Sequence, residues 1–366
     1  MKIAYVVLKG MPIGGGIEKY TEEVGSRLAD RGHDVIVYTT RHYGSVEGSF
    51  KGMTIKTVPS FRSKSLEKIT AAFMATISQC RQKEVDIVHF HAFGPAMFCF
   101  IPRVRGRKVV VQGHGIEWMR SRWGYWGKLF LRLTEIPSVK FPHVVTAVSL
   151  VQKEYLMKKH GVDCVYIPTG VNPPQPEEPD LIKQHGLYGN DYILFVARLV
   201  REKGAHYLID AYKRLNTDLK LVIAGDVEHE KAYKEELYQL AAGNDNIIFT
   251  GFATDKMLHE LFSNCYMFVL PSEMEGLPIA LLEGMSYGNC CLVSDIPENL
   301  EVLDDKGYTF KNKDIDDLSK KIDYLAKNSD AVASVRQKAK THVLENYSWS
   351  MVASKIEKLY TTLLNQ

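Results

Sequence analysis

The 366-residue sequence lacks the features that mark membrane-spanning and disulfide-bonded proteins. Its longest apolar stretches fall well short of the ~20 residues that a transmembrane helix needs. The apolar run Ile3–Leu8 is also too short for the core of a signal peptide, and a glycine-rich turn follows it. The six cysteines include no Cys-x-x-Cys pair and lie mostly in apolar strings, which indicates reduced thiols in a protein core. We therefore expect a cytosolic protein.

The sequence also carries little net charge, but that charge is unevenly distributed. The formal net charge is +3, yet the first 170 residues hold 25 Lys and Arg against 13 Asp and Glu, a net charge of +12. The remainder holds 21 against 30, a net charge of −9. A basic first half suits anionic lipid headgroups or a lipid-linked pyrophosphate. Nucleic acid is the competing partner, but no nucleic-acid-binding motif is present.

Short apolar runs alternate with helical patterns along the chain, which is typical of parallel sheets covered by helices. One series starts at Ile3–Leu8, and a second starts at Tyr192–Val196, after a segment with four prolines and three acids. The pattern predicts an α/β protein with two doubly wound, Rossmann-like domains. We place the N-terminal domain at residues 1–170, a linker at 171–190, the C-terminal domain at 191–348 and a last helix at 349–366.

One stretch of the second half combines a strand end, a tight loop and a helix start. Met267–Leu270 predicts a strand, while Pro278 and Gly288 suit the first turn of a helix and the residue past its end. A loop that leads into a helix N-terminus offers free backbone N–H groups to a phosphate. Glu275 in the loop and Glu283 on the helix are two carboxylates of this apolar segment. They could grip sugar hydroxyls, or they could be solvated glutamates beside an amphipathic helix.

Other polar groups follow further predicted strands. Arg198 and Lys203 share the loop after Tyr192–Val196, where both cations could reach one diphosphate or could simply be exposed. Gly15 and Gly16 follow the first strand, where they allow a close approach to a ligand or form a plain tight turn.

His114 stands between two glycines just past the predicted strand Lys108–Gln112. That position is the carboxyl edge of a parallel sheet, where ligands bind, although a core histidine is the alternative. His89 and His91 would point to the same side of a strand, but no third ligand with metal spacing accompanies them. Asp-x-Asp occurs at residues 314–316 where a helix begins, which favours helix capping. We therefore expect no metal site.

Several segments of the sequence resemble signatures of the retaining glycosyltransferases of family 4. The Glu-x7-Glu stretch at 275–283, with Glu-Gly-Leu-Pro inside it, resembles the family's central motif. The string at 198–204 resembles its Arg-x4-Lys-Gly phosphate clamp, and 169–172 resembles its hinge. The passage 114–124 resembles a string of a bacterial subfamily that builds cell-surface polysaccharides. The resemblance covers nearly the whole chain and implies the GT-B fold, whose two domains face each other across a cleft while the last helix crosses back to the first domain.

The resemblance implies a role for each candidate residue. His114 and Glu275 would hold the transferred sugar as the catalytic pair, and Glu283 would bind the ribose of the nucleotide. The donor-binding set would be Gly15, Gly16, Arg198, Lys203, Gly276, Leu277, Pro278 and Glu283. Trp118, Arg120 and Arg122 would lie on the acceptor side, unless they belong to an exposed amphipathic helix with anchoring aromatics.

We therefore expect a retaining, metal-independent hexosyltransferase that uses a nucleotide diphosphate sugar, with UDP as the expected nucleotide. No cofactor is expected, and no covalent nucleophile is evident. The acceptor would be a glycan or polyprenyl-linked saccharide of lipopolysaccharide or capsule synthesis. The basic residues Arg103, Arg105 and Arg107 predict peripheral association with the anionic inner face of the cytoplasmic membrane. A nucleotide-sugar epimerase of the same architecture and a non-catalytic nucleotide-sugar-binding protein are the alternatives.

Overall fold

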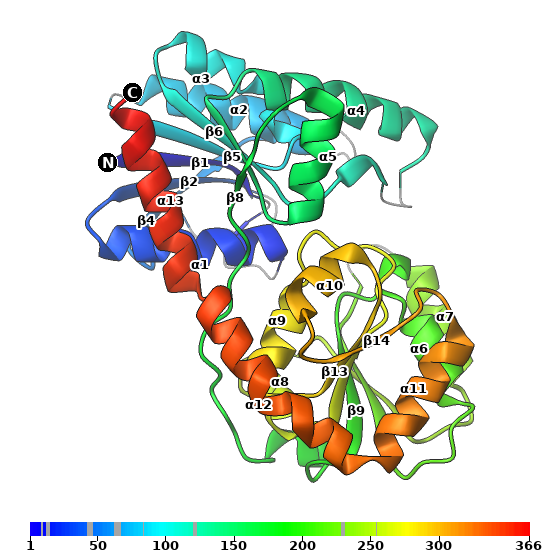
Figure 1. Ribbon diagram of the computed structural model, residues 1–366. Coiled ribbons are helices and arrows are strands. Elements are labelled where there is room, and N and C mark those ends of the chain that lie inside the picture. Colours follow the sequence, from blue (N-terminus) through cyan, green and yellow to red (C-terminus); the bar gives the residue numbers. More distant parts are fainter. Residues whose placement is uncertain are drawn as a thin grey trace. The chain divides into compact units, whose positions relative to one another are not determined.

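The computed structural model describes residues 1–8, 10–11, 15–41, 47–61, 67–82, 84–119, 123–227, 231–253 and 255–366 (Figure 1). The described chain forms two compact units. Unit 1 consists of Met1–Gly170 with Trp349–Gln366, and unit 2 consists of Val171–Ser348. Each unit is a sheet with helices on it, which confirms the predicted α/β class.

Unit 1 contains a sheet in the order β3-β4-β2-β1-β5-β6-β7-β8, parallel except for the β3–β4 pair. Its strands are β1 (Lys2–Leu8), β2 (Asp34–Thr40), β3 (Gly48–Phe50), β4 (Met53–Val58), β5 (Ile87–His91), β6 (Lys108–Gly113), β7 (Val144–Ala147) and β8 (Val165–Tyr166). Its helices are α1 (Gly16–Asp30), α2 (Glu67–Arg81), α3 (Phe100–Val104), α4 (Tyr125–Lys140), α5 (Leu150–His160) and α13 (Trp349–Leu364), with short 3-10 turns η2 (Pro95–Phe98) and η3 (Glu117–Met119).

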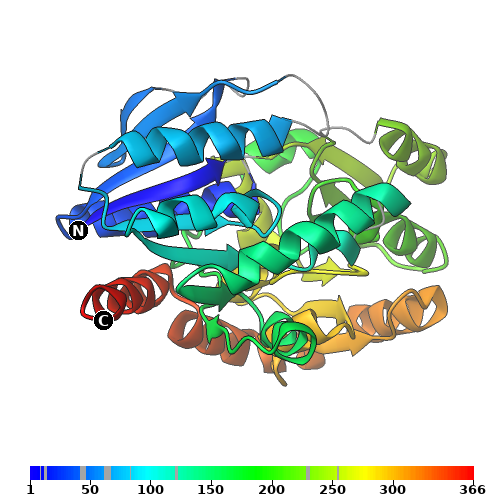
Figure 2. The same ribbon diagram turned by 90° about the horizontal axis from the view of Figure 1, so that it is seen from above.

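Alternate residues of each central strand serve the two faces of this sheet. Ile3 and Tyr5 of β1 face α1 and α13, while Ala4 and Val6 face the cluster that includes α2. All four are buried, so both faces of the sheet are covered, as expected for parallel strands. Figure 2 shows α2 and the red α13 on opposite faces of the strands of unit 1.

The last helix belongs to unit 1 although it follows unit 2 in the sequence. Apolar side chains spaced three or four apart along α13 pack against the sheet and α1, namely Trp349, Val352, Ile356, Tyr360 and Leu363. Burying each large apolar side chain contributes about 1.5–3 kcal/mol. Arg31 at the end of α1 also pairs with Glu357 at 2.6 Å.

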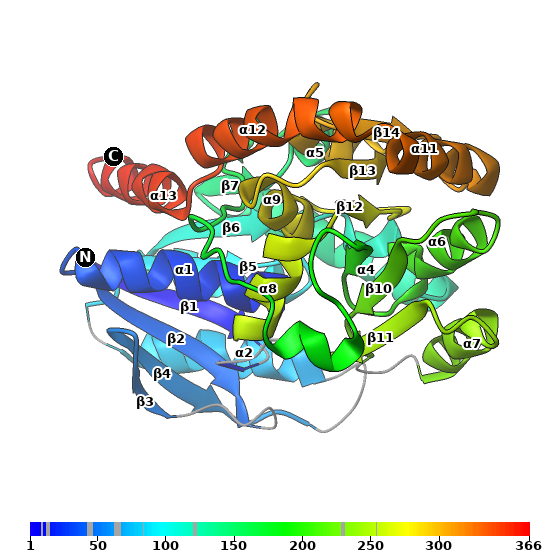
Figure 3. The ribbon, with the colours of Figure 1, turned by 90° about the horizontal axis from the view of Figure 1, so that it is seen from below.

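Unit 2 contains a fully parallel sheet in the order β11-β10-β9-β12-β13-β14. Its strands are β9 (Tyr192–Val196), β10 (Lys220–Ala224), β11 (Ile247–Gly251), β12 (Met267–Leu270), β13 (Cys291–Ser294) and β14 (Tyr308–Phe310). Its helices are α6 (Ala205–Tyr212), α7 (Lys231–Ala241), α8 (Asp255–Asn264), α9 (Ile279–Ser286), α10 (Pro297–Leu303), α11 (Ile315–Lys327) and α12 (Ser329–Asn346), with 3-10 turns η4 (Leu181–His185) and η5 (Arg201–Lys203). Figure 3 shows α6 and α7 on one side of the strands and α8 and α9 on the other.

The segment expected as a linker, residues 171–190, lies in unit 2 and packs against α8. The carboxylate of the fully buried Glu260 accepts hydrogen bonds from the backbone N–H groups of Asp180 at 2.9 Å and Ile182 at 3.1 Å. Ile182 and Leu187 are themselves fully buried. The prolines keep this segment out of regular structure, but a buried carboxylate fastens its far part to the unit.

The cysteines lie mostly in the interior of the protein. All six cysteines are free thiols, and five of them are buried. No helix within the described ranges is long and apolar enough to cross a membrane.

Candidate functional site

Three backbone segments meet at the carboxyl edge of the sheet in unit 2. The parallel strands β9, β10 and β12 are neighbours, so the loops that follow them start at the same edge. Gly204 ends the first loop with φ +72°, and a Cβ there would lie 2.0 Å from the carbonyl oxygen of Pro271. A Cβ on Gly225, after β10, would lie 1.8 Å from the carbonyl oxygen of Ala197. Only glycine fits these contacts, which hold the loop after β9 against both of its neighbours.

This loop carries the two cations predicted to bind phosphate. Lys203 Nζ donates to Glu275 Oε1 at 2.5 Å, and the two side chains are 17% and 7% exposed. The backbone N–H of Glu273 donates to the carbonyl of Glu202 at 2.8 Å, which joins the same two loops. Arg198, at the start of the loop, is exposed. The fold thus brings a predicted phosphate-binding cation against the predicted catalytic carboxylate of unit 2.

Glu273 is a charged residue of this loop that the sequence did not single out. Its carboxylate accepts a hydrogen bond from Tyr207 OH at 2.7 Å and pairs with Lys313 Nζ at 2.7 Å. Burial raises the pKa of Glu273, but the hydrogen bonds and charge of these two partners outweigh it, so the pKa lies below its usual value. An ionised Glu273 therefore braces the loop two residues before Glu275. The position of Glu273 on the same loop as Glu275 was the feature of the sequence that could have identified it.

The helix after the loop begins one residue later than predicted. Pro278 is the N-cap of α9 rather than part of its first turn, and its carbonyl accepts the first helical hydrogen bonds. Gly288 follows the helix with φ +75°, as predicted. Gly284 faces the ring of Phe268, and a Cβ there would lie 3.0 Å from that ring, which lets α9 pack closely on β12.

The remaining donor-side residues lie around the start of α9. Leu277 is buried, whereas Gly276 and Glu283 are half-buried. The first backbone N–H groups of a helix have no intrahelical partner, so this end can accept an anion.

A second carboxyl, Glu298 at the start of α10, lies within electrostatic range of Glu275. Burial raises the pKa of Glu298, its own backbone N–H opposes this, and the negative charges of Glu275 and Glu301 raise the pKa further. The net effect is a raised pKa, which marks a crowded group of carboxylates on this edge of unit 2.

In unit 1, His114 lies where the loop leaves β6, as the sequence predicted. Its Nε2 lies 3.2 Å from Nδ1 of His91, and its ring packs edge-on against Tyr20 of α1 with centroids 5.3 Å apart. Burial lowers the pKa of His114 to about 3, although the negative charge of Glu117 opposes the change. The imidazole is therefore neutral at physiological pH.

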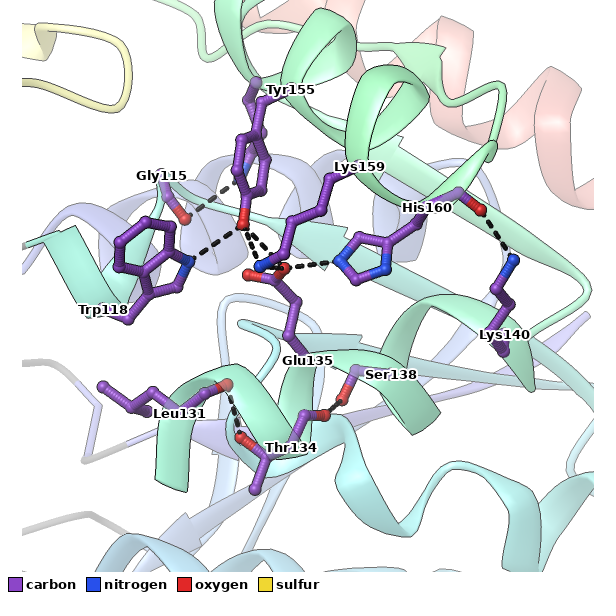
Figure 4. A network of polar contacts seen from close by, with 11 residues as sticks. Gly115, Trp118, Leu131, Thr134, Glu135, Ser138, Lys140, Tyr155, Lys159 and His160 are labelled. Carbon is purple, nitrogen blue, oxygen red and sulfur yellow. Dashed lines mark hydrogen bonds and ion pairs between the residues drawn. The ribbon is translucent and has the colours of Figure 1, made fainter. Parts of the chain in front are cut away.

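The loop that follows His114 is braced from α5 and α4 (Figure 4). Gln152 Nε2 donates to the carbonyl of Gly115 at 3.0 Å, and Trp118 Nε1 donates to Tyr155 OH at 2.9 Å. Tyr155 OH donates in turn to the buried carboxylate of Glu135 at 2.8 Å. The indole N–H of Trp118 is thus already used in a hydrogen bond within unit 1.

Further polar groups complete this brace. Lys159 Nζ and His160 Nε2 both contact Glu135 Oε1, at 2.9 and 2.6 Å. The guanidinium of Arg132 stacks 4.1 Å over the ring of Trp118. Arg120 and Arg122, the other predicted acceptor-side residues, lie outside the described residues.

Gly15 and Gly16 stand at the N-terminus of α1. Gly15 is the N-cap, Gly16 is the first helical residue, and Glu18 occupies the third helical position. A Cβ on Gly15 would lie 2.2 Å from Glu18 Oε2, so this acid folds back over the helix start in the manner of a capping box. The Glu18 carboxylate therefore occupies the space that a side chain at Gly15 would need.

The groups suspected of metal binding have structural partners. His89 and His91 are both buried and stack on one side of β5, as predicted. Asp314 caps α11 by accepting from the N–H of Asp317 at 3.0 Å, which confirms its capping role. Among the described residues, no group of three or more His, Cys, Asp or Glu side chains could hold a metal ion.

Comparison with known families gives matches over most of the chain. The family model "Glycosyl transferases group 1" matches residues 177–342, and the model "Glycosyltransferase Family 4" matches residues 14–175. The two models divide the chain close to the boundary between the two units.

Curated relatives match over parts of their length. An uncharacterized glycosyltransferase of Methanocaldococcus jannaschii is 30% identical over 172 residues, which are 46% of this chain and 44% of the relative. The N,N'-diacetylbacillosaminyl-diphospho-undecaprenol alpha-1,3-N-acetylgalactosaminyltransferase of Campylobacter jejuni is 26% identical over 240 residues, 62% of each chain. The chain thus spans about half to two thirds of the length of these relatives.

A solved structure matches over the whole chain. HepE of Anabaena, in complex with UDP and glucose, superposes with a TM-score of 0.84 at 18% identity and covers 99% of this chain and 100% of its own. This likeness concerns the fold, and it confirms the predicted GT-B architecture of two Rossmann-like domains.

The raised pKa of Glu298 leads to a prediction about pH-dependent stability. Because the folded protein binds this proton more tightly than the unfolded chain, the group contributes stability that is fully present below the ordinary carboxyl pKa. That contribution is lost as the pH rises through the raised value. Glu298→Gln removes the titration, so the Tm of the variant minus that of the wild type should become more positive from about pH 4 to about pH 7.

Thermal unfolding in a pH series measures this difference. The exposed Glu345 offers a matched control, because Glu345→Gln removes a carboxyl from the same unit. A Tm difference for Glu298→Gln that does not change with pH would contradict the crowding of carboxylates around Glu275.

Proposed function

Because the chain belongs to the glycosyltransferases of group 1 and family 4, we propose that it transfers a hexose with retention of configuration. The donor is a nucleotide diphosphate sugar, and the acceptor is a glycan or a lipid-linked saccharide. The observation that carries this proposal is the Lys203–Glu275 pair, in which a diphosphate-neutralising cation and a sugar-binding carboxylate meet at one sheet edge.

Departure of the nucleotide leaves negative charge on a diphosphate, and that charge must be stabilised in the transition state. Lys203, Arg198 and the N-terminus of α9 supply positive charge at this edge of unit 2. We propose that these groups do the work for which other transferases use a metal ion. Glu275 releases Lys203 to the diphosphate and binds the sugar, while Glu283 binds the ribose.

His114 acts on the transferred sugar from unit 1. Its imidazole is neutral at physiological pH, so it offers a hydrogen bond without repelling the positive charge that develops at the anomeric carbon. Gly15 and Gly16 offer backbone N–H groups at the start of α1. The proposal therefore assigns donor contacts to residues of each unit.

The expected donor is a UDP-sugar, and the expected acceptor is a polyprenyl-linked saccharide. The UDP and glucose bound to the HepE structure support the donor, since the chain shares that fold. The undecaprenol diphosphate in the name of the Campylobacter relative supports a lipid-linked acceptor of surface polysaccharide synthesis.

An inverted pattern on α4 supports a place for this reaction at a membrane. The buried residues of α4 are Thr134, Glu135, Ser138 and Val139, three of which are polar. Its exposed side chains include an apolar series at helical spacing, which we call the α4 stripe: Trp126, Leu129, Phe130, Leu133 and Ile136. A soluble helix normally buries its apolar face, so an exposed stripe marks an interaction surface.

Cations accompany the α4 stripe. Lys128, Arg132 and Lys140 lie on the same helix, and its one acid, Glu135, is buried. Each basic residue near an anionic bilayer contributes about 1 kcal/mol to binding. We therefore propose that α4 lies on the anionic inner face of the cytoplasmic membrane.

Two arginines that the sequence suggested for membrane binding have structural partners. Arg103 donates to the carbonyl of Pro142 at 2.8 Å, and Arg107 donates to that of Gln82 at 3.0 Å. Neutralising them would disturb unit 1 itself. The α4 stripe is therefore the better target for a test.

Loss of the phosphate-binding cation should slow transfer. Lys203→Ala or Arg198→Ala should lower kcat by about 10²–10³, because each removes a group that stabilises developing charge. The measurement is UDP release from a panel of UDP-sugars, with and without a membrane extract that supplies acceptor. Release that depends on the extract would also separate a transferase from an epimerase or a binding protein.

A surface lysine of unit 2 provides the control for these variants. Lys327→Ala removes an exposed cation paired with Asp323 and should leave transfer unchanged. Normal transfer kinetics in Lys203→Ala would remove the phosphate-clamp assignment.

Transfer should persist in excess EDTA, because protein cations and a helix N-terminus neutralise the diphosphate. Rates measured before and after chelation, and after addition of Mg²⁺ or Mn²⁺, test this expectation. Complete loss of activity with EDTA, restored by either ion, would show that the reaction needs a metal.

The protein should float with vesicles that contain anionic lipid at low salt, and binding should weaken at high salt, where the Debye length shortens. Trp126→Glu combined with Leu133→Glu, which alters residues 77% and 58% exposed, should abolish flotation without unfolding the protein. Tyr188→Glu changes an aromatic side chain of unit 2 that is 70% exposed and serves as the matched control. Failure of the wild type to float at low salt would favour a soluble acceptor.

A further inference from the structure

Three histidines form a connected series inside unit 1, which we call the histidine ladder: His89 and His91 on β5, and His114 after β6. The rings of His89 and His91 stack with centroids 4.5 Å apart, and His91 Nδ1 lies 3.2 Å from His114 Nε2. At the far end, His89 Nδ1 lies 2.6 Å from Tyr360 OH on α13. His89 and His91 are 0% and 1% exposed.

His114 depends on side-chain contacts for its orientation, because its backbone neighbours are glycines. Gly115 has φ +112°, a backbone conformation that favours glycine, and a glycine has no side chain to pack against the imidazole. The ring of Tyr20 limits the position of the imidazole on one side, with centroids 5.3 Å apart. The contact between His91 Nδ1 and His114 Nε2 sets the rotation of the His114 ring. It does not use the second ring nitrogen of His114, Nδ1.

All three rings are neutral at physiological pH. Burial lowers the pKa of His89 and of His114 to about 3, and it lowers that of His91 well below the usual range. A neutral imidazole has one N–H donor and one nitrogen that accepts. One proton must therefore lie between His91 and His114, and it belongs to one ring or the other.

The buried surroundings decide where that proton lies. His91 Nε2 and His89 Nε2 are both buried without a hydrogen-bond partner among the described residues. An orphaned buried N–H is rarer in proteins than an acceptor with an unused lone pair. Both rings therefore carry their proton on Nδ1. His89 then donates to Tyr360 OH, and His91 donates to His114 Nε2.

From this geometry we infer that His91 is a positioning residue that fixes the proton of His114 on Nδ1, so that His114 presents an N–H donor to the substrate. The lone pair of His114 Nε2 is occupied by His91, so His114 cannot act as a base through that nitrogen. The ring serves instead as an oriented hydrogen-bond donor to a sugar oxygen. This inference rests on the proposed function only for the identity of the ligand.

Nitrogen-15 NMR of histidine-labelled wild-type protein tests the proton placement without any substitution in the ladder. The two neutral tautomers have distinct nitrogen shifts and couplings, and comparison with His114→Ala identifies the signals of His114. We expect His114 to carry its proton on Nδ1 across the physiological pH range. A His114 signal with the proton on Nε2, or one that titrates near pH 6.5, the ordinary histidine pKa, would overturn the inference.

Two substitutions test the positioning role. His91→Leu removes the donor and should lower kcat by about 10- to 100-fold, the effect typical of losing the partner that orients a metal-bound histidine. His91→Asn places an amide nitrogen near the original Nδ1, so it should restore most of kcat and the Nδ1 tautomer. Equal activity of His91→Leu and wild type, or equal loss in both variants at matched stability, would show that His91 only fills space.

A further variant separates positioning from general damage to unit 1. Tyr360→Phe removes the acceptor at the other end of the ladder. It should lower the Tm while leaving the tautomer of His114 unchanged. If His114 has the expected tautomer but His114→Ala retains full transfer activity, the proposed function of His114 fails while the structural inference stands.

Discussion

The close approach of Gly204 to the backbone of Pro271 is the contact on which the candidate site of unit 2 depends. A side chain at Gly204 would overlap the Pro271 carbonyl, and φ +72° would strain any other residue. Because this contact brings the loops after β9 and β12 together, Lys203 reaches Glu275 at 2.5 Å. Lys203 ends the short 3-10 turn η5, and Glu275 lies on a loop outside any helix or strand. The close packing of these two backbone segments therefore positions Lys203 and Glu275 relative to each other.

The polar groups of the two candidate sites are stabilised in different ways. In unit 2, Lys313 and Tyr207 compensate the charge of Glu273, so its pKa is lowered despite its burial. In unit 1, burial keeps the histidine ladder uncharged, and hydrogen bonds hold its rings in register. Under the proposed function, the charged groups of unit 2 suit a diphosphate and the neutral rings of unit 1 suit an uncharged sugar. A cation that is paired with a carboxylate can exchange that partner for a phosphate. An uncharged hydrogen-bond donor can contact a sugar without a large desolvation cost.

Much of the fold could be predicted from the sequence, because buried parallel strands and amphipathic helices have local signals. Tyr192–Val196, Met267–Leu270 and Trp349–Leu364 have the bounds that their apolar patterns predicted. The positions of individual candidate residues in the loops could also be predicted, since they follow such strands. The pairings could not be predicted. His89 meets Tyr360 across 271 residues, and Lys203 meets Glu275 across 72, so no local period records either contact. The proline-rich segment misled for a similar reason, because its anchor, Glu260, lies far along the chain.

Helix α4 buries mainly polar side chains and exposes apolar ones, so its attachment to unit 1 needs an explanation other than the burial of an apolar face. An amphipathic helix is usually held by the burial of its apolar face. In α4, polar contacts supply much of the attachment: Glu135 accepts from Tyr155 and Lys159 on α5, and Ser138 donates to the carbonyl of Phe93. Such hydrogen bonds are worth more where water is excluded, and each costs free energy if broken by a slip of the helix. They therefore fix the rotation of α4, and that rotation directs the α4 stripe outward. The same carboxylate supports, through Tyr155, the loop that follows His114, so the outward-facing stripe and the segment next to His114 are held by one buried group.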